Sequence, residues 1–140
     1  MTTFDTIFDA ACVYAGLDWC YVTDNADRNL QVDAANEVYP RIWRTMVEPL
    51  TPLFDSLERV ERQLSLYIVE IGFNGDLTKT ELVERLEDIM NRFILWRTYM
   101  RNNGIEVVIT GQPFPNWEQT PLDEYGYVIN LTCRYTICQN

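Results

Sequence analysis

Apolar side chains recur at steps of three and four residues from Thr3 to Gly16, while Asp5 and Asp9 lie on the other side. With about 3.6 residues per turn, this spacing gives one apolar face and predicts an amphipathic helix. Thr3 is expected to cap the helix. Gly16 is expected to end it, because glycine readily takes the left-handed conformation that closes a helix.

Three segments in the first half of the chain have the character of strands. Residues 19–22 form a short apolar run, and residues 39–45 alternate aromatic or apolar side chains with arginines. Pro40 has no amide proton for a sheet ladder, so the second strand is predicted to lie at a sheet edge. Residues 63–73 are mostly apolar, which favours a strand covered on both faces.

The clearest element begins at Thr78. Thr78 and Glu81 have the spacing of a capping box, and Leu77 with Leu82 has the spacing of a hydrophobic staple. Gly104 is expected to close the helix in the left-handed conformation. The predicted core stripe consists of Leu82, Leu86, Ile89, Met90, Phe93, Ile94 and Met100.

The C-terminal part of the chain contains two more predicted strands. Residues 105–110 are a β-branched run, and residues 125–138 alternate so regularly that they predict a long, half-buried antiparallel strand. The intervening residues 111–124 contain three prolines and are expected to form a loop that carries Phe114 and Trp117.

Together these elements predict one domain over residues 1–140. The expected fold class is α+β, with a mixed, mainly antiparallel sheet and two main helices packed on one face. Residues 46–62, which include Pro49 and Pro52, are expected to form either a short helix or an extended, protruding arm.

The composition argues against catalysis. The chain has no histidine, so Ser-His-Asp and Cys-His arrangements and histidine-ligated zinc are excluded. The acidic pairs, such as Glu84 with Asp88, fit the solvated face of a helix, and Asp24, Asp27 and Asp33 lack the spacing of a calcium loop. We therefore expect no enzyme, no cofactor and no metal.

The net charge of −10 limits the possible partners. An acidic chain repels phosphate, so tight nucleic-acid binding is not expected. The apolar runs are far shorter than the ~20 residues of a membrane-spanning helix. The first residues lack the basic and apolar layout of a secretory signal, so synthesis in the cytoplasm is expected, with reduced cysteines.

Arginine, tryptophan and tyrosine are abundant, and these residues are enriched at protein interfaces. Two segments carry them in unusual settings, residues 39–44 and the proline-rich loop. They are expected either to fold back as a lid over the core or to dock onto a neighbouring subunit. The candidate interface residues are Tyr39, Arg41, Trp43, Arg44, Phe54, Phe114 and Trp117.

The order of elements resembles the tail terminator and neck proteins of bacteriophages. The similarity spans roughly residues 3–138 and is one of element order and pattern. It is carried by the opening helix, the segment Val38-Tyr39-Pro40-Arg41-Ile42-Trp43, the strand over residues 64–73, the helix that starts after Asp76-Leu77-Thr78, and the closing strand.

This resemblance implies a virion protein without catalytic residues. Identical subunits would form a ring at the junction of capsid and tail and contact neighbouring connector or tail proteins, with DNA passing through an acidic lumen. The proline-containing arm over residues 46–62 departs from the family pattern, so a ring component of another connector, such as that of a short-tailed virus, is nearly as consistent.

Two alternatives stay open. The chain could be a monomeric domain that binds a small molecule or a peptide in an aromatic-lined pocket. It could also be a hydrolase that uses an acidic dyad without histidine. The oligomeric state distinguishes the hypothesis of ring assembly from the hypothesis of a monomeric binding domain.

Overall fold

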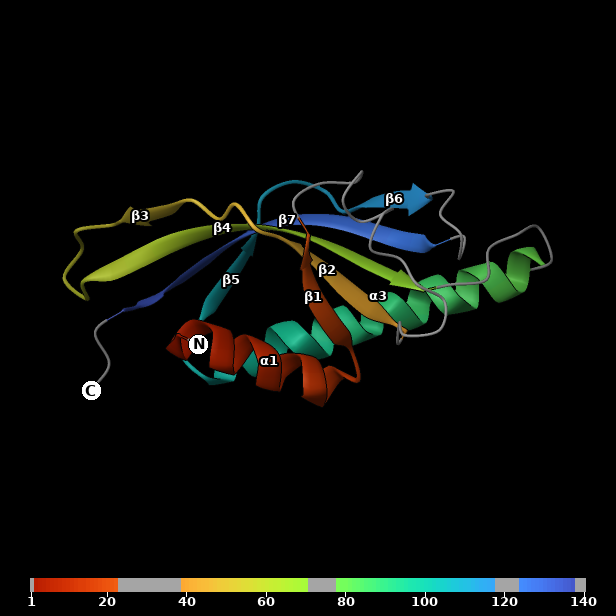
Figure 1. Cartoon of the computed structure of the whole chain (residues 1–140), viewed down its shortest axis with the longest axis horizontal. Coiled ribbons are helices and arrows are strands. Elements are labelled where there is room, and N and C mark those ends of the chain that lie inside the picture. The colour runs from red at the N-terminus through yellow and green to blue at the C-terminus, as the bar shows by residue number, and fades with distance from the viewer. Residues whose placement is uncertain (1, 23–38, 71–77, 118–123, 138–140) are drawn as a thin grey trace.

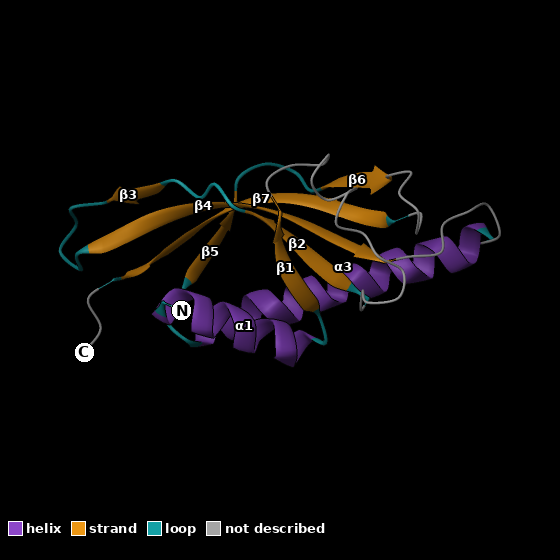
Figure 2. Cartoon of the chain, in the orientation of Figure 1, coloured by secondary structure: helices purple, strands orange, loops and turns teal. Residues whose placement is uncertain are grey.

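The computed structural model describes residues 2–22, 39–70, 78–117 and 124–137. Within these ranges both helices lie against one face of a single sheet (Figure 1, Figure 2). The predicted Leu77 staple, the Asp24, Asp27 and Asp33 segment and Cys138 lie outside the described residues.

The sheet has seven strands in the order β1-β2-β4-β7-β5, with β3 paired to β4 and β6 paired to β7. Among the described strands β1 and β2 run parallel, and the remaining pairs are antiparallel. The predicted α+β class is therefore confirmed. The strands are β1 Asp18–Val22, β2 Arg41–Thr45, β3 Leu50–Pro52, β4 Arg59–Glu70, β5 Glu106–Ile109, β6 Phe114–Trp117 and β7 Tyr125–Thr136.

The two long strands, β4 and β7, form the spine of the sheet. They pair over their whole length, from Arg59 opposite Thr136 to Glu70 opposite Tyr125. Each spine strand carries two short strands in series along its outer edge, β2 and β3 on β4, and β5 and β6 on β7.

The structure corrects two strand predictions. β2 lies between β1 and β4, so the edge position inferred from Pro40 is wrong. Pro40 precedes the strand, where its missing amide costs no ladder bond, and its carbonyl accepts from Asp18 N at 3.1 Å. Residues 111–124, predicted as a loop, contain strand β6. Residues 46–62 contain β3 and the start of β4, so of the two alternatives for this segment the short helix is wrong.

The first helix, α1, spans Thr3–Ala15. Its cap is Thr2, one residue before the predicted one, because the Thr2 hydroxyl accepts from Asp5 N at 3.1 Å. Gly16 ends the helix as predicted, with a left-handed φ of 71°.

The second helix, α3, spans Lys79–Asn102 and begins as predicted. The Thr78 hydroxyl accepts from Glu81 N at 3.2 Å and donates to the Glu81 carboxylate at 3.0 Å. Gly104 follows the helix with φ 85°. The buried stripe is Ile89, Phe93, Trp96 and Met100.

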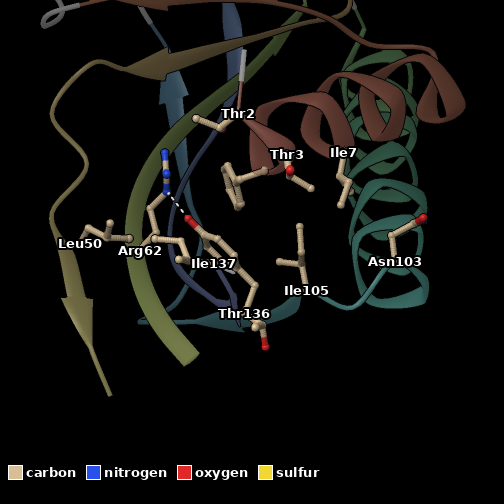
Figure 3. Close-up of a pocket in the computed structure, with 11 residues that line it drawn as sticks. Thr2, Thr3, Ile7, Leu50, Arg62, Asn103, Ile105, Thr136 and Ile137 are labelled. Atoms are coloured by element: carbon tan, nitrogen blue, oxygen red, sulfur yellow. Dashed lines mark hydrogen bonds between the residues drawn. The ribbon is translucent and has the colours of Figure 1, made fainter. Parts of the chain in front are cut away.

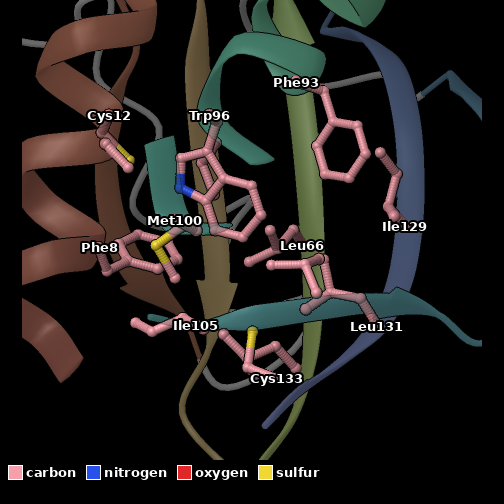
Figure 4. Close-up of a cluster of buried hydrophobic side chains, with 14 of the residues drawn as sticks. Phe8, Cys12, Leu66, Phe93, Trp96, Met100, Ile105, Ile129, Leu131 and Cys133 are labelled. Carbon is pink, nitrogen blue, oxygen red and sulfur yellow. The ribbon is translucent and has the colours of Figure 1, made fainter. Parts of the chain in front are cut away.

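The predicted stripe of α3 needs one correction. Ile94 is exposed, while Trp96 is fully buried and stacks on Phe93 with ring centroids 5.6 Å apart. Phe8 of α1 meets the Trp96 ring edge-on at 5.5 Å. These rings fill the space between the helices and the spine strands (Figure 4). Neither helix combines the length and apolar character of a membrane span in the part of the chain that the structure describes.

Candidate assembly surface

Most of the predicted interface residues are used inside the fold. Arg44 points from β2 toward the helices and is fully buried, and Trp43 points to the opposite face and is also fully buried. Arg41 is nearly as buried. The interface prediction is corrected for these three residues, because a central strand has both faces covered.

Arg44 is the centre of a buried charge cluster. Its Nε and Nη2 lie 2.5 and 2.6 Å from the two carboxylate oxygens of Glu48, and Nη2 lies 2.9 Å from Asp5 Oδ1. Burial would lower the pKa of Arg44, but the hydrogen bonds and charge of Glu48 raise it. The guanidinium carbon also lies 4.4 to 5.4 Å from the ring centroids of Phe4, Phe8, Trp19 and Tyr21.

A second, smaller cluster lies on the other face of the sheet. The carboxylate of buried Glu124 accepts from Trp43 Nε1 at 2.9 Å and from the Tyr39 hydroxyl at 2.5 Å. Arg41 lies over the Trp43 ring and pairs with Asp18 at 2.5 Å. Of the two expectations for residues 39–44, these contacts match packing within the chain's own fold.

Phe54 is the candidate that lies on the surface. It belongs to the arm, which consists of residues 46–62 and contains β3, a turn and the first four residues of β4. Its side chain is 84 % exposed, and four further apolar side chains of the arm are also exposed. These are Met46, Val47, Leu50 and Leu57.

The turn that carries Phe54 is held by Asp55. Asp55 Oδ1 accepts from the amides of Leu57 and Arg59, both at 3.1 Å, and Oδ2 accepts from Arg59 Nε at 2.8 Å. The amide of Arg59, helped by its guanidinium, holds the pKa of Asp55 below its usual value. Phe54 and Glu58 both have φ 52°. Residues other than glycine rarely adopt this left-handed backbone conformation, and it persists where the surrounding structure enforces it.

The root of the arm is tied to the core through Glu48. Besides its two bonds to Arg44, Glu48 accepts from Arg62 Nη1 at 3.2 Å. Backbone bonds continue the attachment, from Gln63 N to Pro49 O at 3.0 Å and from Leu53 N to Arg59 O at 2.9 Å. The exposed apolar side chains are therefore presented by an ordered element.

A cavity of about 340 Å³ lies between the start of α1, the end of α3 and the ends of the spine strands. Figure 3 shows Leu50 and Ile137 on one side of it and Ile7 and Ile105 on the other. Most of its wall is apolar. Its main polar feature is Arg62, whose Nε donates to the Tyr135 hydroxyl at 2.9 Å.

Phe114 and Trp117 lie in β6, at the opposite end of β7 from the strand pairs of the arm. The structure therefore does not bring them together with Phe54. Their side chains lie outside what the structure describes. Among the described residues, no group of three or more acidic or cysteine side chains is placed to hold a metal ion.

The sequence pattern did not single out Glu48, Asp55 or Arg62. Glu48 and Asp55 each form an ion pair with an arginine four positions away. This spacing normally marks a helix, and here it occurs in non-helical backbone. Arg62 carried no local signal, because its partners Glu48 and Tyr135 come from other strands or loops.

Comparison with models of known protein families and with curated proteins found no match for this chain. The arguments for a function therefore rest on the geometry of the arm, on the charge of the surface and on the pattern of the sequence.

Proposed function

We propose that this protein is a structural component of a bacteriophage virion, where copies of it form a ring at the head-to-tail junction. The observation that carries the proposal is the arm, which presents five exposed apolar side chains on ordered backbone. The resemblance in element order to tail terminator and neck proteins supplies the location and the ring.

The arm differs from ordinary surface apolar residues. Single exposed apolar side chains are common on monomers and need no explanation. Here they gather on one element, and the most exposed is an aromatic residue of the kind that anchors interfaces. The turn is held by three hydrogen bonds to Asp55 within one chain, and such a preformed turn lowers the entropy cost of association.

The charge fits the passage of DNA. Arg41, Arg44, Arg59, Arg62, Arg92 and Arg134 all pair with carboxylates of the same chain. Most of the described arginines are therefore neutralised within the chain, and the net charge of −10 repels phosphate. A ring lumen built from such subunits would let DNA slide without binding it.

The oligomeric state tests the proposal. Light scattering after size exclusion is expected to show a species larger than a monomer, and negative-stain electron microscopy should show annular particles. Phe54→Ser should weaken association by roughly tenfold or more, as interface anchors do. Val13→Ser is the matched control, because Val13 is 75 % exposed but belongs to α1 and not to the arm. A chain that stays monomeric at every concentration would refute the proposal.

The cavity supports the second candidate, a monomeric domain that binds a small molecule. Its volume of about 340 Å³ lies within the range of roughly 300–1,000 Å³ of ligand pockets, and its apolar wall with few polar groups is typical of them. A strict monomer whose thermal midpoint rises with small aromatic ligands, and whose response is lost in Ile105→Trp, would favour this function instead.

A further inference from the structure

Helix α3 carries opposite charges at its two ends. Its first half contains Glu81, Glu84, Glu87 and Asp88 together with Lys79 and Arg85, so acidic residues prevail there. Its last two turns contain Arg97 and Arg101 and no acidic residue. Neither Glu84 nor Glu87 forms an ion pair with another described residue.

The acidic half of α3 extends beyond the sheet. Figure 1 shows the first turns of the helix running past the ends of the strands. No residue between Thr78 and Asp88 is buried, and the first buried residue is Ile89. Val83 is exposed on this segment. Leu86 packs against the core and Arg85 donates to the Tyr125 hydroxyl at 3.3 Å, so one side of this segment is attached to the fold. The other side, with Glu84 and Glu87, is exposed to a neighbouring molecule.

The basic end of α3 borders a groove of about 550 Å³ along the outer edge of β5. Arg97 Nε and Nη2 donate to the carbonyl of Val107 at 3.2 and 3.1 Å. A further strand pairing with the edge of β5 would need this carbonyl as an acceptor, and it is already used. Arg101 is exposed and forms no ion pair within the ranges that the structure describes. The half-buried Val108 and Ile109 line the same groove. Glu106 also lines the groove, but its carboxylate pairs with Arg59 at 3.2 Å and lies 4.0 Å from Arg134, so its charge is compensated within the chain. Arg101 is then an unpaired charge of the groove, which suits acidic side chains with apolar neighbours better than a β-strand.

The acidic and basic ends of α3 cannot form ion pairs with each other within one molecule. Glu84 and Arg101 are 17 positions apart, and at 1.5 Å per residue they lie roughly 25 Å from each other along the axis. Most of the chain's other described arginines form ion pairs, so exposed Arg101, beside Arg97, is a cation that an acidic neighbour can reach. A second copy of this chain carries both complementary charges, an acidic segment and a basic groove.

We infer that copies of the protein join head to tail, with the acidic first half of α3 of one copy in the Arg97–Arg101 groove of the next. The inference rests on the proposed ring function and names one of its contacts. A contact between two different surfaces repeats from copy to copy and closes into a ring when the rotation permits. The arm supplies a separate, apolar contact.

Charge reversal at the two ends tests this contact in the full-length protein. Arg101→Glu should raise the dissociation constant of the assembly by roughly tenfold, because an attractive pair becomes a repulsive one. Glu84→Arg should do the same. The double variant E84R/R101E should regain most of the affinity, since each contact is restored with reversed signs. Added salt should weaken the wild type and the double variant alike.

Lys79→Glu is the matched control, because it changes the net charge as Arg101→Glu does but adds an acid to the acidic end. It should leave association unchanged or slightly stronger. Circular dichroism checks that every variant is folded, as expected for exposed positions.

The outcomes separate this inference from the proposed function. If the wild type assembles and Arg101→Glu assembles equally well, or E84R/R101E regains nothing, the charge contact is wrong while the ring proposal stands. If the largest species is a closed dimer, the head-to-tail direction is overturned. If the wild type is a monomer under all conditions, the proposed function fails first, and this inference fails with it.

Discussion

Substitution of Glu48 by glutamine removes one charge from the buried cluster and keeps the shape of the side chain. Glu48 is only 7 % exposed and accepts three hydrogen bonds, two from Arg44 and one from Arg62. The amide can still accept at one oxygen, but its nitrogen must face an arginine. Arg44 is left with Asp5 as its remaining carboxylate partner.

The expected loss follows from the burial of Arg44. Removing one partner of a buried ion pair costs about 3–5 kcal/mol, because the other charge stays in the interior without compensation. Asp5 compensates part of that charge, so we expect about 3 kcal/mol for Glu48→Gln. With a urea dependence of about 2 kcal/mol per molar, the midpoint of unfolding should fall by roughly 1.5 M.

Asp88→Asn is the control for this measurement. It makes the equivalent change in an ion pair with Arg92, but Asp88 is 55 % exposed. Exposed pairs of this spacing contribute about 0.3–0.5 kcal/mol, so the midpoint should hardly move. Urea denaturation followed by tryptophan fluorescence measures both variants. If Glu48→Gln loses no more stability than Asp88→Asn, the cluster does not hold the arm in the way described.

Two further predictions concern titratable groups. Burial would raise the pKa of Asp5, but Arg44 and the Thr2 hydroxyl outweigh it and hold the pKa below 3.8. The stability that Asp5 contributes is therefore complete above its unfolded pKa and is lost as the pH falls through the lower folded value, so Asp5→Asn should flatten the acid limb of a stability-against-pH curve. Burial raises the pKa of the Cys133 thiol to about 12. In the native state iodoacetamide should therefore modify the partly exposed Cys20 well before Cys133, as mass spectrometry of the labelled peptides can show; equal rates would contradict the burial of Cys133.

Local chemistry explains why the helices could be predicted from the sequence. The caps at Thr78 and Gly16 depend on contacts within four or five residues, and the structure has both of them. The long strand β7 was predictable for the same kind of reason, since its alternation reflects one covered face and one less covered face.

Strand order could not be predicted in this way. β2 is central only because β1 and β4 pair with its two edges, and that pairing depends on residues far away in the chain. The surroundings of Arg44 are also non-local, because four rings from α1 and β1 enclose its guanidinium. The sequence pattern showed an arginine beside aromatic residues, which fits an interface as well as a buried cluster.

A stabilising role alone does not explain why the chain contains this buried charge cluster, because removing the charges from water costs free energy. Apolar residues of similar volume often replace a buried ion pair with no loss of stability, so the pair itself is weak evidence of a stabilising role. Here the cluster joins three parts of the fold, the start of α1, strand β2 and the root of the arm. An ion pair demands a defined geometry, whereas an apolar contact tolerates several.

The cluster therefore fits a role in fixing the direction of the arm before association. A fixed arm gives up less conformational entropy when it meets a second copy. On the proposed function, Glu48→Gln should weaken association even at a temperature where the variant is fully folded, whereas Asp88→Asn should weaken it less. Sedimentation of both variants, with folding checked by circular dichroism, decides the point. Equal association of the folded variants would leave the cluster without a part in assembly.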